Sequence, residues 1–138
     1  MRHRLKVKVL LVAATLAAAA LPLLASVTDA NGPTPRFGYD VMGRRISRVL
    51  PGGQTETYGY DAAGNMTSKT DFNGKTTTYT YDDANRLTAK VPDASFDAPG
   101  VAFTYSATGM RLTMTDASGD TAYAYDERDR LVEKAGPV

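Results

Sequence analysis

The sequence contains no cysteine and no tryptophan, and its single histidine is His3. Without cysteine the chain cannot form disulfides, even if it is exported. Because neither Cys nor His occurs after residue 3, the sequence also excludes a Ser-His-Asp or Cys-His catalytic arrangement and a Cys/His metal site from the rest of the chain. No cofactor is expected.

The first 30 residues predict a hydrophobic N-terminal signal helix. Four basic residues lie among residues 2–8, an apolar run broken only by Thr15 covers 9–21, and Pro22 and small residues follow. Cleavage is expected after Ala30 or, as a weaker option, after Ala25. An uncleaved anchor is the alternative, because 9–27 could nearly span a bilayer. Either outcome exports the rest of the chain, so we expect a secreted or extracytoplasmic location at the cell surface.

The predicted domain comprises residues 31–138. Removing residues 1–30 takes away four basic residues and Asp29, which leaves 12 Lys and Arg against 14 Asp and Glu, a net charge of −2. Weakly acidic, interspersed charge is not typical of a nucleic-acid-binding surface. We therefore expect no nucleic acid partner, and contact with a membrane only through the N-terminal segment if it is retained.

Five copies of an aromatic pattern fill this domain. Each copy has an aromatic residue, one intervening residue and a tyrosine, and the tyrosines follow one another at steps of 21, 21, 24 and 20 residues. All eight tyrosines of the protein occupy these two aromatic positions. A fixed period of this kind is the signature of a repeat architecture. The copies lie near residues 36–50, 56–71, 76–92, 101–116 and 121–134.

Each copy predicts a β-hairpin. Aromatic residues at i and i+2 point to one face of an extended strand, and segments such as 76–81, "TTTYTY", favour a strand through their β-branched and aromatic content. A turn and a second, more polar strand follow. The expected fold is therefore all-β, a curled antiparallel meander of tandem β-hairpins with about ten short strands.

The turn between the two strands has its own chemistry. An Asp at the first position can accept hydrogen bonds from amides just ahead of it, and a Gly at the fourth tolerates positive φ. Asn85 and Asp129 replace that Gly, and Ser106 replaces the Asp. The candidate structural positions are Tyr39, Asp40, Gly43, Tyr60, Asp61, Gly64, Tyr81, Asp82, Tyr105, Gly109, Tyr125 and Asp126.

Apolar residues of the second strands are expected to fill the gaps between the aromatic rings. First strands of adjacent copies are two strands apart, about 9.6 Å, so their rings cannot stack directly. We predict that the gaps are filled by Ile46, Met66, Leu87, Leu112 and Leu131.

The pattern Tyr-x-Tyr-Asp-x-x-Gly-Arg with a following apolar residue resembles the YD repeat of Rhs and teneurin-like proteins. The segments "YDVMGRRI" (39–46), "YDAAGNM" (60–66) and "YDDANRL" (81–87) carry the resemblance, which covers about residues 36–134. It implies hairpins stacked into a shell, here a partial one. In bacterial relatives the shell encloses a C-terminal toxin, and in animal relatives it belongs to an adhesion receptor.

The resemblance implies an exported, non-enzymatic structural or interaction module. The alternative is a cell-surface adhesin or carbohydrate-binding module, in which the tyrosine face stacks on sugar rings. Partners would be other YD repeats, a second copy joined through sheet edges, or a surface glycan or protein. The sequence leaves open whether the chain is complete or a truncated gene.

Other candidate sites have structural explanations. Asp82, Asp83 and Asp61 could form a carboxylate pair for acid-base chemistry, but each recurs at a turn position, which favours turn capping. Asp71-Phe-Asn-Gly74 begins like a calcium loop yet is not followed by the later acidic ligands, so no metal is expected. Asn65-Met-Thr67 is a glycosylation sequon that overlaps the turn motif.

Overall fold

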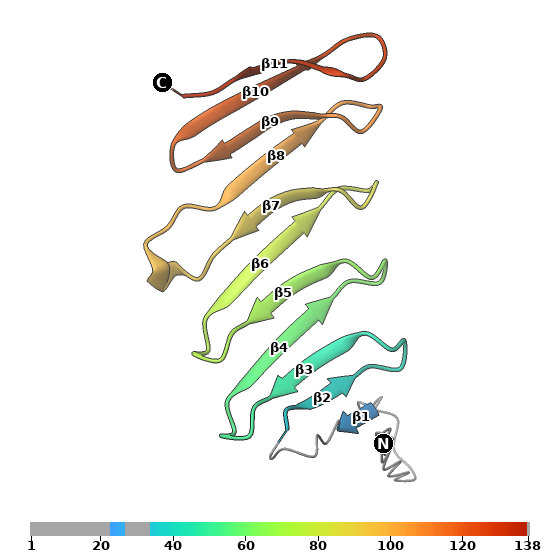
Figure 1. Ribbon diagram of the computed structural model, residues 1–138, viewed down its shortest axis with the longest axis vertical. Coiled ribbons are helices and arrows are strands. Elements are labelled where there is room, and N and C mark those ends of the chain that lie inside the picture. Colours follow the sequence, from blue (N-terminus) through green and yellow to red (C-terminus); the bar gives the residue numbers. More distant parts are fainter. Residues whose placement is uncertain (1–22, 27–33, 138) are drawn as a thin grey trace, which may run out of the picture. The chain divides into compact units, whose positions relative to one another are not determined.

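The structure is a computed structural model that describes residues 23–26 and 34–137. It is all-β, an antiparallel meander in which sheet order follows the sequence (Figure 1). The strands are β1 (Leu23–Ser26), β2 (Arg36–Tyr39), β3 (Arg45–Val49), β4 (Thr55–Tyr60), β5 (Met66–Thr70), β6 (Thr76–Tyr81), β7 (Leu87–Val91), β8 (Val101–Tyr105), β9 (Arg111–Asp116), β10 (Gly119–Tyr125) and β11 (Leu131–Ala135). The predicted ten strands in five hairpins correspond to β2–β11.

The chain divides into two compact units, which are described separately. One comprises Met1–Gly59 with Lys69–Gly74, and the other comprises Tyr60–Ser68 with Lys75–Val138. In the first unit β2 pairs with β3, and β3 pairs with β4. In the second unit consecutive strands from β6 to β11 pair antiparallel.

The predicted signal helix falls almost entirely outside the described residues. Within the predicted segment 1–30 only Leu23–Ser26 is described, and it forms strand β1 instead of a helix. β1 pairs antiparallel with β2, with Leu23 opposite Tyr39 and Ser26 opposite Arg36. Signal cleavage remains a prediction. In the part of the chain that the structure describes, no helix is long and apolar enough to cross a membrane.

Four of the hairpins each contain one irregularity that the sequence did not predict. In the β6–β7 hairpin Tyr81 lies opposite Leu87 and Thr80 lies opposite Ala89, so that Thr88 is an extra residue on the second strand. The same shift occurs at the second aromatic of the β2–β3, β8–β9 and β10–β11 hairpins. A β-bulge of this kind increases the local twist and changes the face on which the following residues lie.

Little of the described chain is buried. Tyr123 is the only buried apolar residue among the described ones, at 9% exposure, and no described side chain is fully buried. Stability therefore depends on contacts between neighbouring strands more than on a central core. The fold positions two sets of groups, the turn between the strands of each hairpin and the aromatic side chains of its first strand.

Candidate functional site

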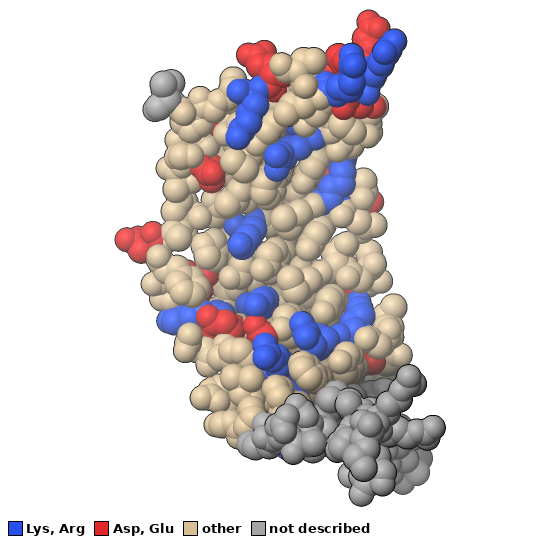
Figure 2. Space-filling model, viewed as in Figure 1, with Lys and Arg blue, Asp and Glu red and all other residues tan. Residues whose placement is uncertain are grey.

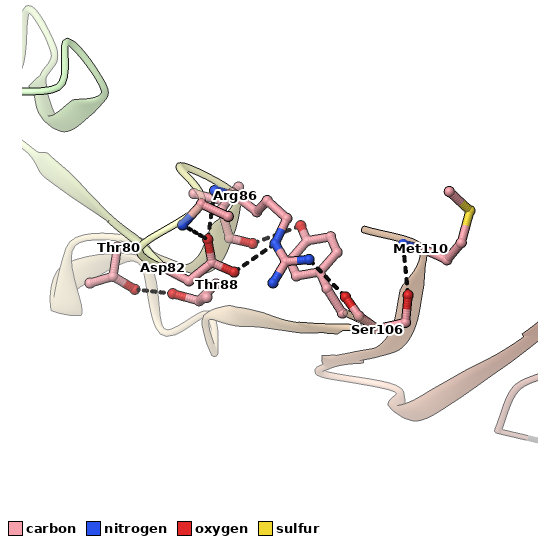
Figure 3. A network of polar contacts seen from close by, with 9 residues as sticks. Thr80, Asp82, Arg86, Thr88, Ser106 and Met110 are labelled. Carbon is pink, nitrogen blue, oxygen red and sulfur yellow. Dashed lines mark hydrogen bonds and ion pairs between the residues drawn. The ribbon is translucent and has the colours of Figure 1, made fainter. Parts of the chain in front are cut away.

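The Asp of each turn binds the backbone ahead of it. Asp82 Oδ1 accepts hydrogen bonds from the amides of Ala84 and Arg86, both at 3.0 Å, and its Oδ2 accepts one from Arg86 Nε at 2.7 Å (Figure 3). Asp40 and Asp126 make the same three contacts with their own turns. The carboxylate thus closes the turn and holds an arginine four residues later.

These contacts lower the carboxyl pKa values. The pKa of Asp82 lies below its ordinary value chiefly because the Arg86 amide donates to the ionised carboxylate. In the second copy the Asn65 side chain lowers the pKa of Asp61 in the same way, since its Nδ2 donates to Asp61 Oδ2 at 2.9 Å. Groups held ionised as hydrogen-bond acceptors are suited to capping a turn and poorly suited to donating a proton.

The predicted positive-φ positions are found. Gly43, Gly64 and Gly109 have φ of 78°, 94° and 95°, and the substitutes Asn85 and Asp129 have φ of 60° and 58°. Asn and Asp are the non-glycine residues that best tolerate this region. The degenerate copies therefore keep the same turn.

Two copies depart from the Asp–Arg pair, the second in one member and the fourth in both members. Asn65 replaces the arginine in the second copy, and its side chain also reaches Asn85 of the next turn. In the fourth copy Ser106 and Met110 replace both members, and only the Met110 amide donates to Ser106 Oγ, at 3.1 Å. Among the described turns, each arginine at this position is paired with the Asp that begins the turn.

The tyrosine at the second aromatic position links neighbouring hairpins. The hydroxyls of Tyr81, Tyr105 and Tyr125 donate to the carbonyls of Met66, Leu87 and Arg111 at 3.0, 2.8 and 3.0 Å. Each acceptor lies at the start of the preceding second strand. This accounts for Tyr at the second position of these three copies, whereas Phe37 and Phe103 are accepted at the first position.

The predicted filling of the gaps by apolar residues is wrong in two copies. The register places Arg45 opposite Tyr39 and Arg111 opposite Tyr105, in the position that Leu87 occupies opposite Tyr81. Ile46 and Leu112 come one residue later, at the bulge, and Leu112 is 40% exposed. The error arose because the bulge changes which second-strand residue faces the rings.

Arginine fills those two gaps by stacking on the rings. The Arg111 guanidinium carbon lies 4.4 Å from the centroid of Tyr123 and 5.9 Å from that of Phe103. The Arg45 guanidinium carbon lies 4.9 Å from Tyr58 and 5.8 Å from Phe37. A guanidinium can lie flat between two aromatic faces and gain both packing and cation–π attraction. In Figure 2, Lys and Arg are spread along the visible face and most Asp and Glu lie toward its margins.

A buried acidic residue in the first unit was missed from the sequence. Glu56 is 6% exposed, accepts a hydrogen bond from the Tyr58 hydroxyl, and pairs with Lys69 Nζ at 2.8 Å. The Lys69 hydrogen bond, followed by that of Tyr58, lowers the pKa of Glu56. Burial raises the pKa of Tyr58, with its hydrogen bond to Glu56 as the second cause. Glu56 lies two residues before Tyr58, so the sequence predicts that both side chains share one face of β4. The sequence does not predict that Lys69 is the ion-pair partner of Glu56.

The loop between β7 and β8 is anchored by one carboxylate. Asp93 caps the short 3₁₀ helix Ala94–Phe96, accepting from the Ser95 amide and hydroxyl at 3.0 and 2.6 Å. Its Oδ2 also accepts from the Thr76 amide at 3.0 Å. These contacts, led by the Ser95 hydroxyl, lower the pKa of Asp93 to about 2. Asp71 and Asp116 instead begin the tight turns that end at Gly74 and Gly119.

The proposed acid-base and metal residues are not brought together into a reactive site. Asp61 and Asp82 cap separate turns, and Asp83 is exposed. Among the described residues, no group of three or more His, Asp or Glu side chains could hold a metal ion. The recurrent groups are all used in closing turns and joining strands.

Comparison with known proteins identifies this architecture. The family model described as RHS Repeat matches residues 23–55, 45–76, 60–95 and 105–137, which together cover most of the chain. The chain belongs to the RHS repeat family. The first match begins at β1, and the others each span at least one of the hairpins described above.

A solved structure shares the fold. The structure titled "Crystal Structure of TcdB2-TccC3 without hypervariable C-terminal region" aligns with a TM-score of 0.63 and 19% identity, covering 83% of this chain and 7% of that chain. "Crystal Structure of TcdB2-TccC3-Cdc42" aligns over 84% of this chain and 8% of that chain with 13% identity, and its TM-score of 0.41 is too low to argue for a shared fold. No curated protein matches. The RHS repeat chain thus spans a small part of the solved chains it resembles.

Proposed function

We propose that this RHS repeat chain is an exported, non-enzymatic structural module, a segment of an Rhs-type shell. The observation that carries the proposal is the tandem hairpin array itself, which matches the RHS repeat model and aligns with TcdB2-TccC3 at a TM-score of 0.63. In such an array each repeat contributes a hairpin whose sides are covered by the next repeat. A module of this kind would act by enclosing or supporting another chain, in full-length relatives a C-terminal toxin.

The structural role is supported by where the polar groups are used. The turn carboxylates bind their own amides, and the second-position tyrosines bind the preceding strand. An enzyme needs titratable groups that are free to exchange protons with a substrate. The described carboxylates with lowered pKa values are instead fixed as acceptors.

Export is the part of the proposal that depends on the N-terminal sequence. N-terminal sequencing of the protein from the extracytoplasmic fraction of its host should find Asn31, or Ser26 for the weaker site, as the first residue. In the same preparation, chemical crosslinking through the exposed Lys90 and Lys134 should join peptides of this chain to other RHS repeat sequences. Recovery of an intact, uncrosslinked chain from the cytoplasm alone would contradict the proposal.

A glycan array separates the shell segment from the carbohydrate-binding alternative. Tyr123 is buried and is stacked by Arg111, which leaves little of its ring for a sugar. We therefore expect no reproducible glycan binding. Binding that is lost in Tyr79→Ala, with the β-sheet retained by circular dichroism, would make an adhesin the better description.

A further inference from the structure

The two faces of the sheet in the second unit differ sharply in chemistry. On one face lie the aromatic pairs with Lys90, Arg111 and Lys134, since the register sets Lys90 opposite Tyr79 and Lys134 opposite Tyr123. On the other face the residues between the aromatics, and those opposite them, are almost all threonine and alanine. This threonine face comprises Thr78, Thr80, Ala89, Val91, Ala102, Thr104, Thr113, Thr115, Ala122, Ala124 and Ala135.

The threonine face is exposed and carries almost no charge. Nine of its eleven residues are exposed, the other two being Ala89 and Thr113. Two ionised side chains of the described strands β6–β11 lie on this face. They are Asp120, at the start of β10, and Glu133, on β11. A solvated sheet face ordinarily carries charged or long polar side chains, which also oppose association.

Most hydroxyls of this face have a hydrogen-bond partner within the sheet. Thr80 and Thr88 hydroxyls lie 3.1 Å apart across β6 and β7 (Figure 3), and those of Thr104 and Thr113 lie 2.6 Å apart across β8 and β9. Thr115 donates to Asp120 at 2.6 Å. Covering these groups would therefore cost less than burying hydroxyls that have no partner, because each pair already contains one hydrogen bond.

Covering the face would also restrict few side-chain torsions. Alanine loses no rotamer freedom on burial, and threonine is β-branched and already restricted at χ1. The exposed apolar residues Leu112 and Val132, 40% and 63% exposed, occupy the bulge position equivalent to Thr88, which faces this side. They provide the larger apolar contacts that such a surface needs.

We propose that the threonine face is an interface between two copies of this chain, packed face to face. A second copy fits because its own threonine face is uncharged and made of small side chains, so that two sheets can approach at about 10 Å. The opposite face cannot serve in this way, because the positive charges of Lys90, Arg111 and Lys134 would repel those of the second copy. The contact is isologous, with each copy contributing the same residues.

The size of the face predicts a weak dimer. Six strands at about 4.8 Å and strand lengths of about 17 Å give roughly 500 Å² per copy, or about 1,000 Å² in total, at the lower limit of specific interfaces. We expect a dissociation constant between about 10 and 1,000 μM.

The test is sedimentation equilibrium of the purified chain up to about 1 mM, with a lysine placed at the centre of the face. Thr104→Lys and, independently, Ala122→Lys should each weaken association at least tenfold. The matched control is Ala107→Lys, an exposed turn residue away from the face, which should leave association unchanged. Glu133→Thr, which removes a charge from the face, should strengthen association to a dimer while circular dichroism shows an intact sheet.

Three results would overturn the proposal. One is a monomer mass at every concentration. Another is association that is equally strong in Thr104→Lys and Ala122→Lys while circular dichroism shows an intact sheet. The third is association that survives both lysines and is lost on Val132→Pro, which would assign it to pairing of the β11 edge. None of these results bears on whether the chain is a shell segment, which the N-terminal and crosslinking experiments decide.

Discussion

Asn65 Nδ2 donates a hydrogen bond to Asn85 Oδ1 at 2.7 Å, joining the turns of two successive repeats. Each residue is a departure from the repeat pattern, Asn65 from arginine and Asn85 from glycine. Arg86 makes the equivalent connection one repeat later, where its Nη1 donates to the Ser106 carbonyl at 2.8 Å (Figure 3). The residue four after the turn Asp therefore serves two functions, closing its own turn and reaching the next one.

A double-mutant cycle should detect the connection between Asn65 and Asn85. Asn65→Ala and Asn85→Gly are each expected to weaken the second unit, and their effects should be non-additive by about 0.5 kcal/mol, because both remove one hydrogen bond. Glycine is used at 85 so that the φ of 60° remains unstrained. Urea denaturation of the two single variants and the double variant measures the coupling. Strictly additive effects would show that the bond contributes nothing in solution.

The turn glycines provide a second prediction. Gly64→Val should destabilise the fold by about 1–3 kcal/mol, because Gly64 has φ of 94° and a β-branched residue is strained there. Nothing lies within 4 Å of the position of an added Cβ, so a steric clash with neighbours is not the cause. Ala62→Val, in the same exposed turn, is the control and should be nearly neutral. Equal losses in both variants would refute the assignment of the effect to φ.

The two aromatic positions should respond differently to loss of a hydroxyl. Tyr105→Phe removes the hydrogen bond to the Leu87 carbonyl and should cost about 1 kcal/mol. Tyr79→Phe is the matched control, since Phe occupies the first aromatic position in two other copies. It should change stability by less than about 0.5 kcal/mol. Thermal unfolding of both variants checks the difference, and a larger loss for Tyr79→Phe would contradict it.

Much of this fold can be predicted from the sequence because the same sequence pattern recurs in several copies. The period of aromatic pairs predicts the hairpins, and the Asp and Gly positions predict the turns, including their degenerate forms at Asn85 and Ser106. A local rule that recurs five times is far more reliable than a single occurrence.

The features that the sequence did not predict depend on register and on tertiary contacts. The bulge at Thr88 and its equivalents follows from how the two strands pair, and no residue type signals it. For this reason Ile46 and Leu112 were assigned to the ring gaps that Arg45 and Arg111 occupy. Likewise, the pairing of Glu56 on β4 with Lys69 on β5 depends on how the two strands of one hairpin lie beside each other.

Acid should weaken the anchoring of the loop that Asp93 holds. The pKa of Asp93 is lowered from 3.8 to about 2, first by the Ser95 hydroxyl, so folding favours its ionised form. Its contribution is fully present above pH 3.8 and is lost as the pH falls from 3.8 toward 2. Asp93→Asn should therefore lower the urea midpoint at pH 7 relative to the wild type, and the difference should shrink when both are measured at pH 2.5.

The control for this experiment lies in the same loop. Asp97→Asn also replaces a carboxylate with an amide, and Asn tolerates the φ of 46° at this position. The hydrogen bonds with Ser95 and Thr76 are made by Asp93 and not by Asp97. It should not alter the pH dependence. Other turn aspartates with lowered pKa values, such as Asp82 and Asp126, will still produce an acid transition in every variant. The informative quantity is therefore the difference in urea midpoint between Asp93→Asn and the wild type. If the difference in urea midpoint is the same at pH 7 and at pH 2.5, the charge of Asp93 does not anchor the loop.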